Sequence, residues 1–180
     1  KMPQIEIRPA VSPDIIELIN LDHSCKTSYV WQMDRNINEG QFQITFREIR
    51  LPRPIQVPYP RLAEALEDEW QLASGLLVAT HEGKLIGYAK LSEIKEIHSV
   101  VIKDIVVDSM IRRQGVGTTL ILATQNWATQ RSNRKMIFEM PSKNFPAIKL
   151  AFKLGFEFSG YNDSYYPNKD IALFFSKFLK

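Results

Sequence analysis

In several short runs the hydrophobic positions of this chain recur at every second residue, which is the spacing of β-strands. Residues 5–8 and 40–51 alternate in this way, and residues 75–91 consist of two apolar runs on either side of the sequence HEGK. Because Gly83 suits a tight turn, the stretch 75–91 predicts a β-hairpin. Four further apolar runs predict strands at 100–107, 135–140, 156–161 and 171–178.

Helices are predicted where apolar residues recur every three or four positions. The stretches with this spacing are 14–21, 61–73, 115–129 and 146–154. Pro13 suits the start of the first helix, and Gly155 suits the end of the last. Residues 51–60 differ, because their four prolines exclude a helix or a central strand. We expect an extended surface loop there.

Strands and helices are mixed along the chain, with hairpins in the first half and strand–helix–strand units in the second. This order predicts an α/β or α+β arrangement on a mixed sheet. The sequence has no internal repeat and no linker-like stretch. We therefore expect a single domain over residues 1–180.

The composition narrows the classes of function. The chain is 44% hydrophobic and 24% charged, as is usual for a soluble globular protein. No apolar run approaches the roughly 20 residues of a membrane helix, and the start lacks the apolar core of a signal peptide. We expect a cytoplasmic protein with no membrane partner. A net charge of +3 without an arginine-rich run argues against nucleic acid.

The cysteine and histidine content argues against a metal site. Cys25 is the only cysteine, which excludes an internal disulfide and a multi-cysteine zinc site. The three histidines are far apart and show no ligand spacing. We expect structural or surface roles for them, and no metal cofactor.

The segment RRQGVGT at residues 112–118 joins a predicted strand to a predicted helix. Glycines at such a junction let backbone N–H groups face an anion at the positive end of the helix dipole. The segment lacks the Lys-Ser/Thr ending of a P-loop and the three glycines of a dinucleotide fold. On spacing alone, tight-turn packing and anion binding both remain open.

Two longer motifs carry a resemblance to a known family. DIVVDSMIRRQGVGTTLI resembles the acetyl-coenzyme A signature of the GNAT N-acetyltransferase superfamily, in which Arg112, Gly115 and Gly117 match its Arg/Gln-x-x-Gly-x-Gly/Ala pattern. NFPAIKLAFKLGFEFSGY is similar to the family segment that follows at this distance. It matches through Asn144, Ala147, Leu150, Lys153, Gly155 and Phe156.

The resemblance implies a fold and a co-substrate. The GNAT fold is a mixed, mostly antiparallel sheet of about seven strands with helices on both faces. In that fold the strands at 100–107 and 135–140 splay apart, and acetyl-coenzyme A enters the opening. The residues implied in binding it are Val106, Val107, Arg112, Arg113, Gln114, Gly115, Val116, Gly117, Thr118, Asn144, Ala147 and Lys153. The loop N–H groups would hold the pyrophosphate, and the strand would pair with the pantetheine arm.

Amine acetylation needs a proton acceptor for the attacking amine. Asp104 and Val106 share one face of a predicted strand, opposite Ile105, so Asp104 is a candidate base. Glu139 on the neighbouring strand is a second candidate. For each, a structural carboxylate remains the alternative.

The tyrosine with which the family protonates the leaving thiolate falls at Ala151 here, so that acid is missing. Tyr166 is a candidate to replace it, and Trp31 and Tyr165 are candidates to line the acceptor site. Packing roles remain open for all three. The stretch 31–60 forms either an acceptor wall or the surface of a homodimer.

The family implies transfer of an acetyl group to a primary amine by direct attack in a ternary complex. The segments IKDIVV, FEMPSKNFPA and YNDSYYPNKDIALFF resemble the streptothricin acetyltransferase-like branch. That branch implies a small-molecule acceptor, such as a polyamine or an aminoglycoside- or streptothricin-like amine. A protein N-terminus or lysine is the alternative acceptor. A non-catalytic acyl-coenzyme A-binding or scaffold module is the alternative of another class.

Overall fold

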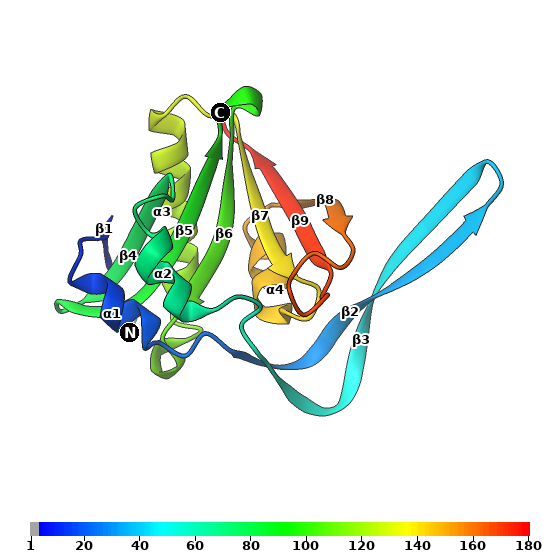
Figure 1. Ribbon diagram of the computed structural model, residues 1–180, viewed down its shortest axis with the longest axis horizontal. Coiled ribbons are helices and arrows are strands. Elements are labelled where there is room, and N and C mark those ends of the chain that lie inside the picture. Colours follow the sequence, from blue (N-terminus) through cyan, green and yellow to red (C-terminus); the bar gives the residue numbers. More distant parts are fainter. Residues whose placement is uncertain (1–3) are drawn as a thin grey trace.

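A seven-stranded sheet runs through the computed structural model, which describes residues 4–180 (Figure 1). Its strand order is β1 (Glu6–Pro9), β4 (Gly75–His81), β5 (Lys84–Ile94), β6 (Ser99–Val107), β7 (Lys135–Pro141), β9 (Ala172–Phe178) and β8 (Glu157–Asn162). Among the strands of the described residues, only β6 and β7 pair in parallel. The mixed, mostly antiparallel sheet predicted from the family resemblance is therefore confirmed.

The parallel pair is short. β6 and β7 pair from Ser99↔Lys135 to Ile102↔Phe138, although β6 continues to Val107 and β7 to Pro141. Beyond these four rungs the strands diverge (Figure 1). The predicted splay is present, and it separates the sheet into two halves at one end.

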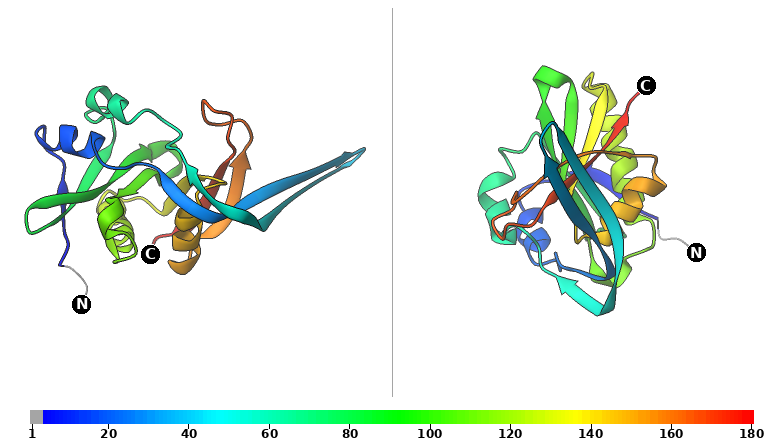
Figure 2. Two further views of the ribbon diagram at one scale, coloured as in Figure 1. Left: turned by 90° about the horizontal axis from the view of Figure 1, so that it is seen from below. Right: turned by 90° about the vertical axis from the view of Figure 1, so that its right-hand side faces the viewer.

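Helices cover both faces of the sheet, as Figure 2 shows. On one face lie α3 (Val116–Gln130) and α4 (Phe145–Lys153), and on the other lie α1 (Asp14–Ile19) and α2 (Leu66–Glu69). Alternation along β4 explains this: Leu77 contributes to the core under α3 and α4, whereas Val78 contributes to the core under α1 and α2.

The helix predicted over 61–73 is shorter in the structure. It consists of a 3-10 turn, η1 (Ala63–Ala65), followed by α2, which ends at Glu69. Glu67, Asp68 and Glu69 all lie in this one-turn helix. Two further 3-10 turns are η2 (Lys95–Ile97) and η3 (Ser109–Ile111).

Strands β2 (Cys25–Asn38) and β3 (Gln41–Val57) form a separate two-stranded arm whose tip projects from the body (Figures 1 and 2). The prediction of a loop over 51–60 is wrong for 51–57, which belong to β3. The strand register jumps between Thr27↔Ile55 and Tyr29↔Arg50. Residues 51–54, with two of the prolines, therefore form a bulge where no ladder hydrogen bonds are needed.

The arm has one apolar and one polar face. Its register places the pairs Met33↔Phe46, Arg35↔Ile44 and Ile37↔Phe42 on one face, and Asp34↔Thr45 and Asn36↔Gln43 on the other. At the root, the Phe46 ring lies 5.5 Å from Phe158 and 5.3 Å from Tyr161. At the tip, Ile37 is 53% exposed and Phe42 is 78% exposed.

Within residues 4–180, the helices are all too short or too polar to span a bilayer. The same residues contain no cluster of three or more histidine, cysteine, aspartate or glutamate side chains able to hold a metal ion.

Candidate active site

The glycine-containing segment joins the end of β6 to the start of α3. Asp108 begins the turn by accepting a hydrogen bond from the Met110 backbone N–H at 3.0 Å. Arg113 and Gly115 then take left-handed backbone conformations, with φ of 63° and 88°. These bends direct the chain into α3, whose first N–H groups have no partner within the helix. The junction thus has the geometry of an anion site.

Gly117 has a packing role in addition. A Cβ on this residue would lie 3.0 Å from Leu150 Cδ2 in α4, closer than an ordinary contact. The absence of a side chain therefore lets the first turn of α3 approach α4. Two roles are open for the glycines from the sequence, tight-turn packing and anion binding. The position of Gly117 against Leu150 supports the packing role.

The Arg112 side chain donates hydrogen bonds to two backbone carbonyls. Its Nε donates to the Val107 carbonyl at 3.0 Å, and Nη2 donates to the Asp22 carbonyl at 2.7 Å. Arg112 thereby ties the loop to β6 and to the segment before β2. Arg113, Gln114 and Lys153 are exposed. The side chains of Arg113 and Gln114, which lie in the loop itself, can therefore approach a phosphate bound there.

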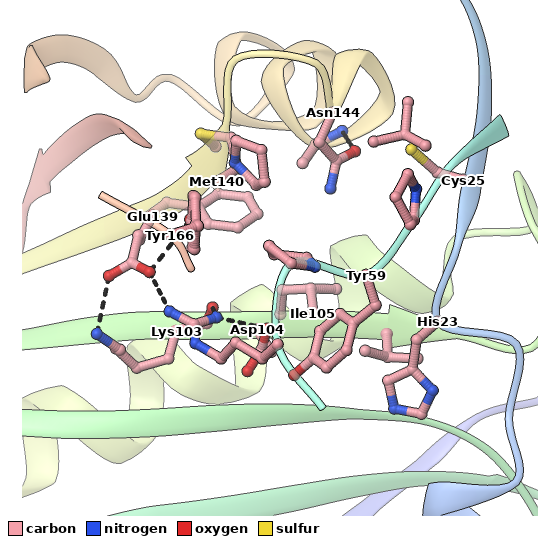
Figure 3. Close-up of a pocket in the computed structure, with 18 residues that line it drawn as sticks. His23, Cys25, Tyr59, Lys103, Asp104, Ile105, Glu139, Met140, Asn144 and Tyr166 are labelled. Atoms are coloured by element: carbon pink, nitrogen blue, oxygen red, sulfur yellow. Dashed lines mark hydrogen bonds and ion pairs between the residues drawn. The ribbon is translucent and has the colours of Figure 1, made fainter. Parts of the chain in front are cut away.

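Asn144 caps the start of α4. Its Oδ1 accepts a hydrogen bond from the Ala147 backbone N–H at 3.2 Å, which leaves the side-chain NH2 as a donor. Asn144 and Ala147 both line the cavity at the splay (Figure 3). Lys153 lies one helical turn beyond Leu150, the residue that faces Gly117.

A narrow cavity of about 50 Å³ occupies the opening between β6 and β7. Figure 3 shows residues of both strands around it, together with side chains from the segments 23–25 and 57–61. Asp104 and Val106 face this side, and Ile105 packs against the opposite core. The facing predicted for Asp104 and Val106 is confirmed.

Glu139 lies at the centre of a buried polar network. Its side chain is 1% exposed and accepts from four groups: the Arg61 guanidinium, Lys103 Nζ at 2.9 Å, the Tyr165 hydroxyl at 3.1 Å and the Tyr166 hydroxyl at 3.2 Å. Such a carboxylate has its hydrogen-bonding capacity filled. This arrangement favours the structural alternative for Glu139 over that of a free base.

Asp104 differs from Glu139 in having one oxygen without a hydrogen bond. Oδ1 accepts from Arg61 Nη1 at 3.0 Å. Oδ2 is buried and accepts from no group in residues 4–180, and its closest cation is Lys90 Nζ at 3.5 Å. Burial raises the pKa of this carboxyl, and the charges of Arg61 and Lys90 oppose that rise. Asp104 is therefore the carboxylate with capacity to take a proton or an N–H.

The tyrosine candidates contact the network. The Tyr166 hydroxyl donates to Glu139, and burial raises the pKa of Tyr166, so it stays protonated at neutral pH. Tyr165 contacts both Glu139 and Lys103, at 3.1 and 3.2 Å. Tyr59 lines the cavity, and burial raises its pKa in the same way. Ala151 is fully buried in the core, so position 151 presents no hydroxyl to the cavity.

Trp31 lies outside the cavity lining. Its backbone N–H donates to the Ser142 carbonyl at 3.0 Å, and its ring lies 6.2 Å from Phe152 on α4. The structure therefore gives Trp31 the packing role that the sequence left open. It anchors the root of the arm to the end of β7 and to α4.

Sequence reasoning missed Arg61 and Lys103. Arg61 is the first residue of the stretch predicted as a helix, 61–73, and nothing in its spacing marks it as a site residue. His23, for which a structural role was expected, lies in the cavity wall. Its Nδ1 donates to the Leu21 carbonyl at 2.7 Å, and its Nε2 lies within hydrogen-bond distance of the Tyr88 hydroxyl, at 3.0 Å.

Comparison with known families decides the class of protein. The model of the Acetyltransferase (GNAT) family matches residues 42–156, more than half of the chain. The chain belongs to the GNAT acetyltransferase family. The loop before α3, the splay and the cavity therefore lie in an acetyltransferase domain.

Relatives of this GNAT acetyltransferase carry related names. Streptothricin acetyltransferase of Streptomyces lavendulae is 26% identical over 166 residues, covering 89% of this chain and 86% of the relative. The crystal structure of nourseothricin acetyltransferase is similar with a TM-score of 0.82 at 24% identity, over 98% and 99% of the two chains. The predicted resemblance to streptothricin acetyltransferases is confirmed.

A second solved structure is similar at lower identity. It is a proposed streptothricin acetyltransferase from Bacillus anthracis str. Ames, crystallised in complex with acetyl coenzyme A. Its TM-score is 0.75 at 19% identity, over 98% of this chain and all of the other. At this identity the likeness shows a shared fold.

Proposed function

We propose that this GNAT acetyltransferase transfers the acetyl group of acetyl-coenzyme A to a primary amine of a small molecule. The observation that carries the proposal is Asp104 Oδ2, a buried carboxylate oxygen without a hydrogen bond beside the splay. A buried carboxylate oxygen is stabilised by a hydrogen-bond donor, and an N–H group of the acceptor amine can be that donor. The names of the relatives support an amine antibiotic or a similar polyamine as the acceptor.

The chain's residues fit the co-substrate. Backbone N–H groups from Arg113 to Thr118 are suited to the pyrophosphate, at the start of α3. The unpaired edge of β6 at Val106 and Val107 is suited to the amide groups of the pantetheine arm. The side-chain NH2 of Asn144 would donate to the same arm.

In the proposed reaction, acetyl-coenzyme A supplies the acetyl thioester. Asp104 takes a proton from the acceptor ammonium, directly or through a water molecule. The neutral nitrogen then attacks the thioester carbonyl, and the carbon–sulfur bond breaks. Tyr166 donates a proton to the thiolate, and its phenolate takes up the second proton that the nitrogen releases as the amide forms. Glu139 holds Arg61, Lys103 and the two C-terminal tyrosines in position.

The test begins with thermal unfolding with and without acetyl-coenzyme A. At about 100 times its dissociation constant the ligand should stabilise the chain by about 2.7 kcal/mol, or roughly 5 to 10 °C. The variant Gly117→Trp should lose this shift, because an indole cannot fit between α3 and Leu150. An absent shift at millimolar acetyl-coenzyme A in the unaltered chain would contradict the proposal.

An acceptor panel then separates the alternatives. We expect turnover with streptothricin or spermidine and none with N-terminal or lysine peptides. Turnover with peptides alone would favour a protein acetyltransferase. Stabilisation by acetyl-coenzyme A without turnover on any amine would favour a non-catalytic binding module.

We also propose that the protein forms a homodimer through the arm. Each chain presents the apolar tip of the arm, Ile37 and Phe42, and a half-exposed aromatic patch at its root, Phe152 and Phe158. A two-fold arrangement can place the arm tip of one copy on the aromatic patch of the other, which would bury both apolar surfaces.

A further inference from the structure

Arg61 occupies the opening in which the acceptor amine would have to bind. Its guanidinium bridges the two halves of the sheet, donating to Asp104 Oδ1 on β6 at 3.0 Å and to Glu139 Oε2 on β7. It also donates to the Lys103 carbonyl at 3.2 Å, and it lies over the Tyr166 ring with Cζ 5.2 Å from the centroid.

The guanidinium lies between β6 and β7. It already donates to Asp104 Oδ1 and Glu139 Oε2, the atoms that a positively charged group of an acceptor would contact. An acceptor cation therefore cannot contact these two oxygens while the guanidinium is in place. Either the acceptor stays outside the splay, or Arg61 leaves.

The hydrogen bonds of Asp104 specify what can replace Arg61. Arg61 is the only side chain in residues 4–180 that meets the distance and angle of a hydrogen bond to the Asp104 carboxylate. Lys90 Nζ lies 3.5 Å from Oδ2, and the Tyr59 hydroxyl is close enough to lower the pKa of Asp104. Departure of Arg61 would still remove the guanidinium from two buried carboxylates, Asp104 and Glu139, which is unfavourable. A neutral acceptor cannot compensate for that loss. A cation with N–H donors can.

The position of Arg61 in the chain makes its departure feasible. It lies between the end of β3 at Val57 and the start of η1 at Ala63, outside any strand or helix. Moving this short segment breaks no strand ladder. Tyr59 lies on the same segment, so both side chains would leave the cavity together.

We propose that Arg61 is an internal cation that a positively charged group of the acceptor replaces, and that it determines specificity for amines with at least two basic groups. One basic group takes the guanidinium's place on Asp104 and Glu139, while another amine is acetylated. This inference rests on the proposed function and adds the charge of the acceptor to it. A monoamine has too few basic groups for both roles.

The test measures acceptor binding in Arg61→Met by isothermal titration calorimetry. Coenzyme A replaces acetyl-coenzyme A, so that no turnover consumes the amine. Because the variant lacks the competing cation, we expect it to bind spermidine at least about tenfold more tightly than the unaltered chain. Propylamine should gain less than spermidine. Methylguanidine should compete with spermidine in the variant.

Arg8→Met is the matched control. Arg8 also binds a buried carboxylate, that of Asp14 at 2.7 and 3.0 Å. It lies on the edge strand β1, which β4 and β5 separate from the splay between β6 and β7. Its loss should leave spermidine binding unchanged. If Arg61→Met does not fold, Arg61→Lys replaces it in the test. A lysine ammonium bridges Asp104 and Glu139 less well than a guanidinium does, so it is easier to displace. Arg61→Lys should bind spermidine more tightly than the unaltered chain, by a smaller factor.

Spermidine binding by the Arg61 variant that is equal, weaker or absent would overturn the inference. So would methylguanidine restoring acetylation to Arg61→Met, since the guanidinium would then be needed during turnover. Failure of the proposed function is separate: it appears as an unaltered chain that acetylates no amine. A chain that acetylates spermidine without a gain in the variant contradicts only the role of Arg61.

Discussion

The two carboxylate oxygens of Asp104 have different surroundings, and we therefore expect different roles for them. Oδ1 is held by Arg61, while Oδ2 is buried without a hydrogen bond. We expect Asp104→Asn to lower kcat by about 100-fold or more, the range of general base catalysis. Because burial raises the pKa of this carboxyl, activity should fall with decreasing pH above the ordinary aspartate range.

The measurement is the pH profile of kcat, in which this acid limb should vanish in Asp104→Asn. The control is Asp34→Asn, since Asp34 pairs with Arg47 on the exposed arm and should leave the profile unchanged. A variant that keeps both the rate and the limb would remove Asp104 from the mechanism.

A second carboxylate predicts a pH dependence of stability. Asp14 accepts two hydrogen bonds from Arg8, which lower its pKa. The native state therefore binds this proton less readily than the unfolded chain, so the pair stabilises above pH ~4 and its contribution is lost as pH falls. We expect Asp14→Asn to cost about 1.5 to 3 kcal/mol at pH 7.

Urea unfolding at pH 7 and pH 3 measures this effect. The difference between Asp14→Asn and the unaltered chain should shrink at the lower pH. A difference of the same size at both values would mean that the loss comes from packing and not from the charge.

The candidate site could be predicted from the sequence only where its residues lie on regular elements. Asp104 and Glu139 were found because strand alternation gives the face of each residue. Arg61 was not found, because it comes from a loop and meets Asp104 only through the fold. The filled hydrogen bonds of Glu139 were equally invisible, since Tyr165 and Tyr166 reach it from the segment before the last strand.

At the scale of elements, the contact between β5 and β6 is unusually close where the coenzyme would bind. Gly87 pairs with Val107, and a Cβ on Gly87 would lie 2.6 Å from the Val106 carbonyl oxygen. A backbone atom cannot rotate away, so Gly87→Ala must move β6. We expect a loss of about 1 to 3 kcal/mol.

The same displacement should reduce stabilisation by acetyl-coenzyme A, because it alters the strand edge at Val106. Thermal unfolding with and without the ligand measures both effects. Lys84→Ala, an exposed change on the same strand, is the control. If Gly87→Ala kept the full ligand shift, the edge of β6 would not be part of the coenzyme site.

Most elements were predictable because their apolar spacing matches the sheet and helix faces that they cover. The two errors have physical causes. Prolines were taken to exclude a strand at 51–57, yet a two-stranded arm has only edges and a bulge accommodates them. The helix at 61–73 is overestimated from its apolar spacing alone, since the structure has one 3-10 turn and one α-helical turn there.

At the scale of the molecule, the arm carries an apolar face that its own body covers only at the root. If two copies cover the tips, Ile37→Asn combined with Phe42→Asn should convert a dimer into a monomer. Sedimentation velocity measures this change. Gln43→Ser lies on the polar face and should leave the dimer intact. An unaltered chain that sediments as a monomer would contradict the proposed assembly.

The strands β6 and β7 are paired over four residues at one end and are unpaired at the other. Beyond Ile102 and Phe138 the two half-sheets share no ladder, and the ion pairs of Glu139 with Arg61 and Lys103 link them. A ligand laid along the open edge would supply the missing rungs. The amide hydrogens of residues 103–107 that point away from β5 should therefore exchange with solvent deuterium faster in the free chain than in the loaded one. Binding of the coenzyme and protection of this strand edge would then be one event.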